Sequence, residues 1–247
     1  MTSKGRARGR GMTPEQPVRP GGGQSLKDPV DELNILVKDL SLSADEREMV
    51  SVREVALKAC TSEEKMEKVF ESLYQRCYED WRFSLCAANI SCQVIASCDA
   101  EHGKAFRNLF LKRVQSDFKN KDKLRTESHQ KFLGAASFLC QIYCQLLDES
   151  GSPFTPLTES VMEILELLLD DKATDVEMHC AAEQFFVVGK TLQASVEKIR
   201  LTGLRNKVKD KIIHAVGSKE VRTELIKVIE GFASEWKHFQ CERIMKK

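Results

Sequence analysis

Apolar residues recur every three or four positions through most of the chain after residue 28. The stripes are clearest over residues 66–77, 106–118 and 221–239. This spacing places apolar side chains on one face of an α-helix. Segments 132–147 and 176–192 are apolar on nearly every side, so we expect these two helices to lie inside the fold. No apolar–polar alternation is long enough to indicate a strand, and the pattern predicts an all-α protein.

The same pattern sets the expected helix boundaries. Capping boxes at Ser43 with Glu46 and at Thr61 with Glu64 predict two helix starts, and Thr155 before a proline predicts a third. Gly203 and Gly217 are predicted helix ends. The expected helices span 30–39, 45–59, 63–79, 82–97, 103–119, 125–148, 158–169, 174–193, 195–215 and 219–239.

Each expected helix has one apolar face and a short connection to the next. A hairpin of two such helices cannot fully bury its apolar surface by itself, whereas hairpins that stack on one another can. Hairpin repeats of about 40–47 residues are typical of helical-repeat proteins. We therefore predict an α-solenoid of about five stacked hairpins of the HEAT type over residues 28–247.

Residues 1–27 differ in composition from the rest of the chain. They contain six of the 13 glycines and three of the six prolines, and six basic residues against the single acid Glu15 give them a charge of +5. A segment with so little apolar surface is expected to be disordered. The remaining 220 residues carry a charge of −4, which argues against broad nucleic-acid binding by the folded part.

Cysteine spacing and hydropathy limit the protein class. The nine cysteines have no C-x-x-C spacing, and most lie among apolar neighbours, so we expect reduced, buried thiols. No apolar run approaches the roughly 18 residues of a membrane span, and no secretory signal precedes the body. These features favour the cytoplasm, with the nucleus as a second compartment.

Candidate reactive groups give no complete site. Gly189-Lys190-Thr191 lacks the earlier glycine of a phosphate-binding loop and falls in a helix. The pairs His179–Cys180 and His238–Cys241 could each supply two zinc ligands, but a structural site needs four. Adjacent acids at 79–80, 148–149 and 170–171 have no catalytic partner at a recognisable spacing. We therefore expect no enzyme activity, no metal and no cofactor.

Basic residues suggest contacts with RNA. Arginines alternate with glycine or alanine in the first residues, a composition that touches phosphates and stacks on bases. A second basic cluster surrounds the end of one expected helix. The candidate RNA contacts are Arg6, Arg8, Arg10, Lys112, Lys119, Lys121, Lys123 and Arg125. A solubilising tail or an import signal explains the arginines equally well.

Four stretches resemble a known family. FRNLFLKRVQSDF (106–118), KFLGAASFLCQIY (131–143), HCAAEQFFVVGKTLQ (179–193) and VRTELIKVIEGFASEW (221–236) are similar, in order, to helices of the middle domain of eukaryotic translation initiation factor 4G. The residues that carry the resemblance are Phe106, Arg107, Leu109, Arg113, Phe118, Gly189 and Trp236. Small members of the family often have Gly-Glu where this chain has Cys140-Gln141.

The resemblance implies a solenoid that acts as an adaptor. Small relatives include poly(A)-binding-protein-interacting, cap-binding-complex-dependent and stem-loop-binding-protein-interacting proteins. Family members present a helical surface to a helicase of the initiation-factor-4A type, to initiation factor 3 or to mRNA-binding proteins. An adaptor in mRNA translation is therefore the favoured function, with direct RNA binding as the alternative and a homodimer left open.

Overall fold

A computed structural model describes residues 28–42, 44–147 and 154–237, and these ranges hold eleven α-helices and two short 3₁₀ turns. The helices are α1 (Pro29–Asp39), α2 (Glu46–Ala59), α3 (Glu63–Glu79), α4 (Ser84–Ser97), α5 (Ala100–Lys119), α6 (Lys121–Glu127), α7 (His129–Gln145), α8 (Thr158–Leu167), α9 (Asp175–Ser195), α10 (Lys198–Ile213) and α11 (Lys219–Ala233). The 3₁₀ turns are η1 (Trp81–Phe83) and η2 (Thr155–Leu157).

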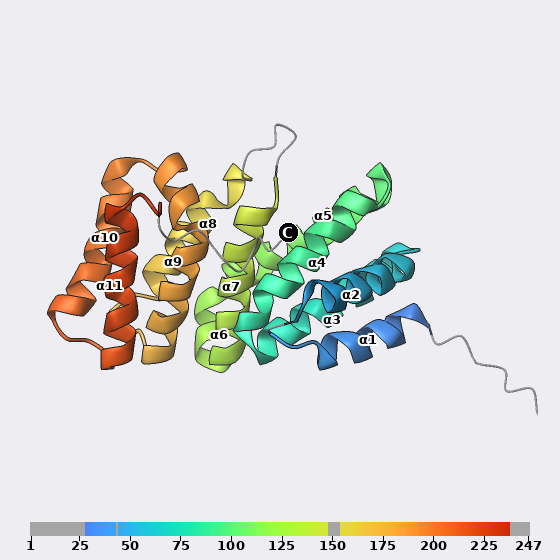
Figure 1. Ribbon diagram of the computed structural model, residues 1–247, viewed down its shortest axis with the longest axis horizontal. Coiled ribbons are helices and arrows are strands. Elements are labelled where there is room, and N and C mark those ends of the chain that lie inside the picture. Colours follow the sequence, from blue (N-terminus) through green and yellow to red (C-terminus); the bar gives the residue numbers. More distant parts are fainter. Residues whose placement is uncertain (1–27, 43, 148–153, 238–247) are drawn as a thin grey trace, which may run out of the picture.

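The helices stand side by side in a row that runs from α1 at one end to α11 at the other (Figure 1). Helix α7 lies in the middle and packs against α3 and α4 on one side and α9 on the other. Helix α9 in turn packs against α11, and α1 packs against α2 and α3. The predicted all-α solenoid is confirmed.

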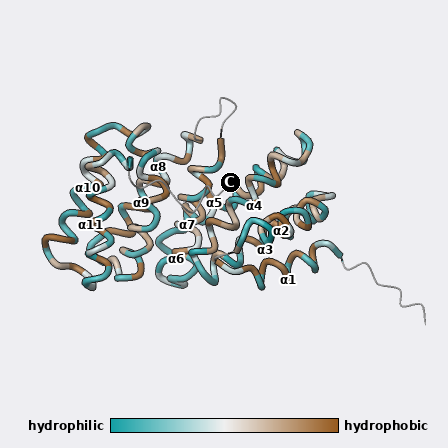
Figure 2. Tube along the Cα trace, viewed as in Figure 1, coloured by the Kyte–Doolittle hydropathy of each residue, from teal (hydrophilic) through white to brown (hydrophobic). Residues whose placement is uncertain are grey.

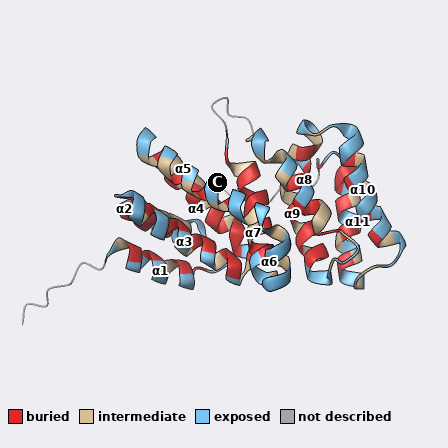
Figure 3. Ribbon diagram, turned by 180° about the vertical axis from the view of Figure 1, so that it is seen from behind, coloured by how far each residue is buried: buried red, intermediate tan, exposed pale blue. Residues whose placement is uncertain are grey.

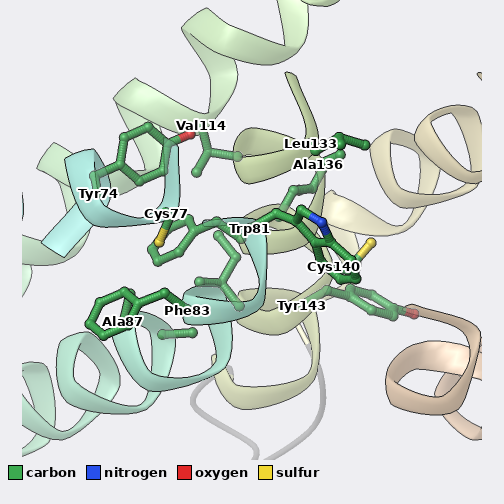
Figure 4. Packing of buried hydrophobic residues seen from close by; sticks show 14 of the residues in the cluster. Tyr74, Cys77, Trp81, Phe83, Ala87, Val114, Leu133, Ala136, Cys140 and Tyr143 are labelled. Atoms are coloured by element: carbon green, nitrogen blue, oxygen red, sulfur yellow. The ribbon is translucent and has the colours of Figure 1, made fainter. Parts of the chain in front are cut away.

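One continuous apolar core runs through the row. Hydrophobic and hydrophilic residues alternate around each helix (Figure 2), and the apolar faces are the buried ones (Figure 3). Central α7 is buried along most of its length, and Figure 4 shows side chains from α3, α4 and α7 meeting at its surface. Burial of α7 and α9 was predicted from their lack of a polar face and is confirmed.

The observed caps lie one or two residues from the predicted ones. Helix α2 begins with a capping box of Asp45 and Glu48, with Glu48 N to Asp45 Oδ1 at 2.9 Å. The proposed cap Ser43 lies outside the described residues. Helix α3 is capped by Ser62, not Thr61, because the extended backbone of Ser62 lets its hydroxyl accept from Lys65 N at 3.3 Å.

The predicted helix 125–148 is wrong, because the chain forms two helices there. Ser128 has an extended backbone (φ −153°, ψ 91°) that ends α6 and starts α7. Periodicity continues across the break, since both helices contribute to the same core. Gly203 is also not a helix end: it lies inside α10. Gly217 does follow a helix, and its φ of +80° suits a residue without a side chain.

The last predicted helix is too long. It ends at Ala233, and Glu235 (φ 51°) and Trp236 (φ 59°) adopt left-handed conformations that turn the chain back. The Trp236 indole then lies between α9 and α11. A Cβ on Gly189 would approach the indole Cζ2 to 2.2 Å, so glycine is required for this contact.

No helix within the described ranges is long and apolar enough to span a membrane.

Candidate partner-binding groove

A groove of about 770 Å³ separates the exposed faces of α3 and α5. Residues at three- and four-residue spacing on each helix form its walls, as expected for two helices packed side by side. Half-buried Leu109 contributes apolar surface, and Met66 and Phe70 also border the groove but are buried. The other lining residues are Glu63, Glu64, Glu67, Glu71, Ala105, Asn108, Lys112, Arg113 and Ser116. We call this feature the α3–α5 groove.

The two walls carry opposite charge. Four glutamates lie on α3, and Lys112 and Arg113 lie on α5. Glu64 pairs with Lys68 at 2.7 Å, and the hydrogen bond from this ammonium lowers the pKa of Glu64. Two of these acids, Glu63 and Glu67, form no ion pair with any residue in the described part of the chain. The groove therefore offers carboxylates that are available to a cationic ligand.

Arg113 is fixed by a cluster of groups from α3 and α5. Its guanidinium contacts Glu71 at 3.1 Å and the Tyr78 hydroxyl at 3.1 Å, and it lies 5.2 Å from the centre of the Tyr74 ring. The Tyr74 and Tyr78 hydroxyls both donate to Asp117, at 2.8 and 2.5 Å. Arg113 therefore stabilises the packing of α5 on α3 and also contributes positive charge to the groove.

The same cluster shifts the pKa values of its members. Burial opposes the charge of Arg113, but the Tyr78 hydroxyl and the neighbouring Asp117 and Glu71 outweigh burial and raise the pKa of Arg113. Burial, with the nearby Asp117 charge, raises the pKa of Tyr74 well above its ordinary value. Burial and the hydrogen bond to Asp117 likewise raise the pKa of Tyr78. The tyrosines therefore remain neutral donors at physiological pH.

The residues that carry the family resemblance are mainly structural. Phe106 is fully buried, and Arg107 lies 4.8 Å from the centre of the Phe154 ring. Phe118 packs under the ammonium of Lys121, which is 4.6 Å from the ring centre. Two of these residues, Leu109 and Arg113, line the α3–α5 groove. The α3–α5 groove therefore includes residues that carry the family resemblance.

The basic residues proposed for RNA differ in their availability. Lys121 pairs with Glu163 at 2.9 Å, and Lys123 pairs with Glu127 at 3.8 Å. Exposed Lys112 and Lys119 have no acidic partner in the described ranges. Lys112 lies in the groove, whereas Lys119 ends α5. The tail residues Arg6, Arg8 and Arg10 lie outside the described residues.

Arg125 is held inside an ion-pair cluster that joins α6 to α9 and to the turn after α8. Its guanidinium contacts Asp170 at 2.6 and 3.0 Å and Glu177 at 2.5 and 3.0 Å. Lys211 donates to the Asp170 carbonyl oxygen at 2.7 Å, and His129 lies 3.4 Å from Glu177. The Arg125 side chain is only 14% exposed. Its charge therefore binds the acids that join α6 to α9 and is not available on the surface.

The Arg125 guanidinium also acts on its two carboxylate partners. Its hydrogen bonds lower the pKa of Asp170. For Glu177, burial raises the pKa, but the hydrogen bonds from Arg125 and from Thr174 N outweigh burial and lower it. Both acids are therefore ionised in the folded protein at neutral pH.

The pair His179–Cys180 does not come together as zinc ligands. His179 Nδ1 contacts Glu224 at 2.5 Å, whereas Cys180 Sγ points into the core and lies 3.3 Å from Ser137 Oγ. No three metal-ligating side chains cluster within residues 28–42, 44–147 and 154–237. His238 and Cys241 are outside these ranges. Gly189-Lys190-Thr191 lies within α9 and forms no phosphate-binding loop.

The departure at Cys140-Gln141 falls in the interior. Both residues are buried on α7, with Gln141 only 5% exposed. The missing acid therefore does not alter an exposed face.

The α3 wall of the groove was not recognised from the sequence. Its signal is present, because Glu63, Glu67 and Glu71 recur every four residues beside the apolar stripe. The packing of this acidic face beside α5 depends on the tertiary fold, and no local pattern indicates it.

Comparison with known proteins agrees with this architecture. Residues 32–231 match the MIF4G domain. The chain is 26% identical over 182 residues to the CBP80/20-dependent translation initiation factor of Xenopus tropicalis, covering 73% of this chain and 31% of that protein. It is 27% identical over 177 residues to MIF4G domain-containing protein B of Danio rerio, covering 70% and 78%.

A third relative is polyadenylate-binding protein-interacting protein 1 of Xenopus laevis. It is 22% identical over 201 residues, which cover 77% of this chain and 43% of that protein. The chain thus spans about a third of the first of these relatives and under half of the third. With a matching family profile across most of the chain and the predicted resemblance confirmed, this protein belongs to the MIF4G domain family.

Proposed function

We propose that this protein is an adaptor in mRNA translation, which binds a translation factor or an mRNA-binding protein through a helical surface. The observation that carries the proposal is the MIF4G domain over residues 32–231, in a chain whose relatives are named as a translation initiation factor and a polyadenylate-binding protein-interacting protein. A helicase of the initiation-factor-4A type and initiation factor 3 are the first partners to test. The site of action is the cytoplasm.

The α3–α5 groove is the surface that we assign to this partner. It combines apolar surface, unpaired charges and the family residues Leu109 and Arg113. Protein interfaces commonly place apolar anchors inside a polar rim, and charge at the rim controls association rate and specificity. Lys112 is exposed at this rim and takes part in no ion pair among the described residues.

Affinity purification of the full chain from cytosolic extract, with mass spectrometry, tests the function. Recovery of a translation initiation factor or an mRNA-binding protein after ribonuclease treatment supports it, and recovery of neither overturns it. Lys112→Glu is expected to reduce this capture. Lys209→Glu, a matched exposed change on α10, is expected to leave it unchanged. Equal capture by both variants would mean that the partner binds outside the groove.

Direct RNA binding is the second candidate. Its support is the Arg-Gly sequence at Arg6, Arg8 and Arg10 together with the unpaired Lys112 and Lys119. So few phosphate contacts predict weak, salt-sensitive binding. Replacing the three arginines with alanine would abolish an RNA mobility shift if the tail carries it.

A further inference from the structure

The basic N-terminal segment joins the folded body close to the acidic wall of the groove. Asp28 precedes the first residue of α1, and its carboxylate lies 3.8 Å from the ammonium of Lys65. Lys65 belongs to the first turn of α3, directly after two residues of the groove wall, Glu63 and Glu64. Figure 1 shows the beginnings of α1 and α3 at the same end of the row. The chain therefore enters the fold within reach of the groove.

The N-terminal segment and the α3–α5 groove carry complementary charge. The groove lining has four carboxylates against two cations, and residues 1–27 carry a charge of +5. Carboxylates accept from guanidinium in a two-pronged geometry, which makes arginine better suited than lysine to such a wall. The unpaired Glu63 and Glu67 lie one helical turn apart on α3.

The sequence of the segment suits a shallow groove. Arg6, Arg8 and Arg10 are separated by single small residues, and glycines precede and follow them. Glycine permits close approach of the backbone to a surface. The arginine stems can cover the half-buried Ala105 and Leu109 while their charged ends reach the carboxylates.

The length of the connection makes this contact effective within one molecule. Seventeen residues lie between Arg10 and Asp28, and at about 5–6 Å times the square root of the residue number a connection of that length spans about 21–25 Å on average. The acidic wall from Glu63 to Glu71 is about 12 Å long at the helical rise. A short connection of this kind gives an effective concentration in the millimolar range, so weak ion pairs suffice for occupancy.

We propose that residues 1–27 dock in cis in the α3–α5 groove, with Arg6, Arg8 and Arg10 on the glutamates of α3. The segment is then an internal competitor for the groove. The docking itself stands on the contacts described above, whereas competition with a partner rests on the proposed function.

Zero-length carbodiimide crosslinking of the full chain tests the docking. The reagent joins an amine to a carboxylate only in direct contact, and Lys4 lies beside the arginines. Lys4 is expected to crosslink within the monomer to Glu63, Glu64, Glu67 or Glu71 near 0.1 M salt. These crosslinks should disappear in 1 M salt, where the screening length falls from about 10 Å to about 3 Å. They should also disappear in the variant Arg6→Ala/Arg8→Ala/Arg10→Ala.

Three results would overturn the proposal. The first is that Lys4 crosslinks no more often to these four glutamates than to the exposed acids Glu54 and Glu230. The second is crosslinking confined to dimers, which would mean contact between two molecules. The third is crosslinking that persists unchanged in the arginine variant, which would assign the contact to Lys4 alone.

A second measurement uses groove variants that remove charge without adding bulk. In Glu63→Gln/Glu67→Gln, trypsin is expected to cleave after the tail arginines at least about twofold faster than in the parent protein, as for loss of two exposed ion pairs. The matched variant Glu54→Gln/Glu230→Gln should match the parent rate, and circular dichroism checks that both fold. Equal rates in both variants contradict docking.

Partner capture separates the docking from the proposed function. If both hold, the arginine variant captures more of the partner than the parent chain does. Crosslinking without any partner would support docking and refute only the adaptor role, whereas partner capture without crosslinking would refute only docking.

Discussion

Replacing Arg125 with methionine tests whether the ion-pair cluster at Asp170 and Glu177 holds the middle of the solenoid together. The change keeps most of the side-chain volume and removes four nitrogen–oxygen contacts of 2.5–3.0 Å. It leaves Glu177, which is 1% exposed, as a buried carboxylate without its arginine. Breaking one side of a buried pair costs about 3–5 kcal/mol.

The structure favours the lower end of that range. Asp170 is 29% exposed, so water compensates part of its loss. We therefore expect Arg125→Met to lower the free energy of unfolding by about 3 kcal/mol. For a chain of this size the corresponding fall in Tm is about 6–12 °C. Urea and thermal unfolding, followed by circular dichroism, measure both quantities.

Arg200→Met is the matched control. Arg200 also pairs with a carboxylate, Glu159, but the side chains are 42% and 71% exposed. Such exposed pairs contribute little to stability, because water screens the two charges. Equal destabilisation by Arg125→Met and Arg200→Met would refute the view that burial makes the Arg125 cluster important.

The pH dependence of the stability difference between the parent protein and Arg125→Met provides an independent check. The folded-state pKa values of Asp170 and Glu177 are lowered below the ordinary values of 3.8 and 4.5. Their stabilisation is therefore present above those values and is lost as the pH falls through the lowered ones. The difference in unfolding free energy between the parent and Arg125→Met should be constant near pH 7 and shrink below about pH 4. A difference that grows in acid would contradict this sign.

Three further predictions follow from single sites. Gly189→Ala should destabilise the fold by about 1–3 kcal/mol, because the added Cβ would collide with the Trp236 indole. Gly203→Ala adds a Cβ in open space inside α10 and should stabilise the fold by about 0.5–1 kcal/mol. Urea unfolding of both variants compares the two effects. Asp45→Ala should cost about 1 kcal/mol through loss of the α2 cap, and an unchanged urea midpoint would refute this role. Burial raises the pKa of Cys77 to about 12 and that of Cys140 well above its ordinary value, so Ellman's reagent at pH 8 should label them only after unfolding.

The fold could be predicted from the sequence because most helices carry their own signal. The stripes on α3, α5 and α11 identify each helix and its buried face, and the apolar α7 and α9 identify the interior. The errors fall where a tertiary contact determines the backbone. The break at Ser128 accompanies the placement of Arg125 against Glu177, and no local pattern marks it.

The candidate groove could be predicted only in part. Leu109 and Arg113 were singled out through the family resemblance, and Lys112 through its charge. Their position opposite the glutamates of α3 requires helices separated by about 40 residues to pack together, which periodicity does not determine. Arg125 shows the converse, since its formal charge suggested a surface role, whereas the structure places it against two acids.

The position of Trp236 also affects how the protein acquires its fold during synthesis. The indole that fills the space beside Gly189 and Gly231 comes from the final described turn, which follows all eleven helices of the described ranges. Domains emerging from the ribosome form their N-terminal parts first. The packing between α9 and α11, which also includes the contact of Phe185 with Phe232, is therefore completed only once residue 236 has emerged.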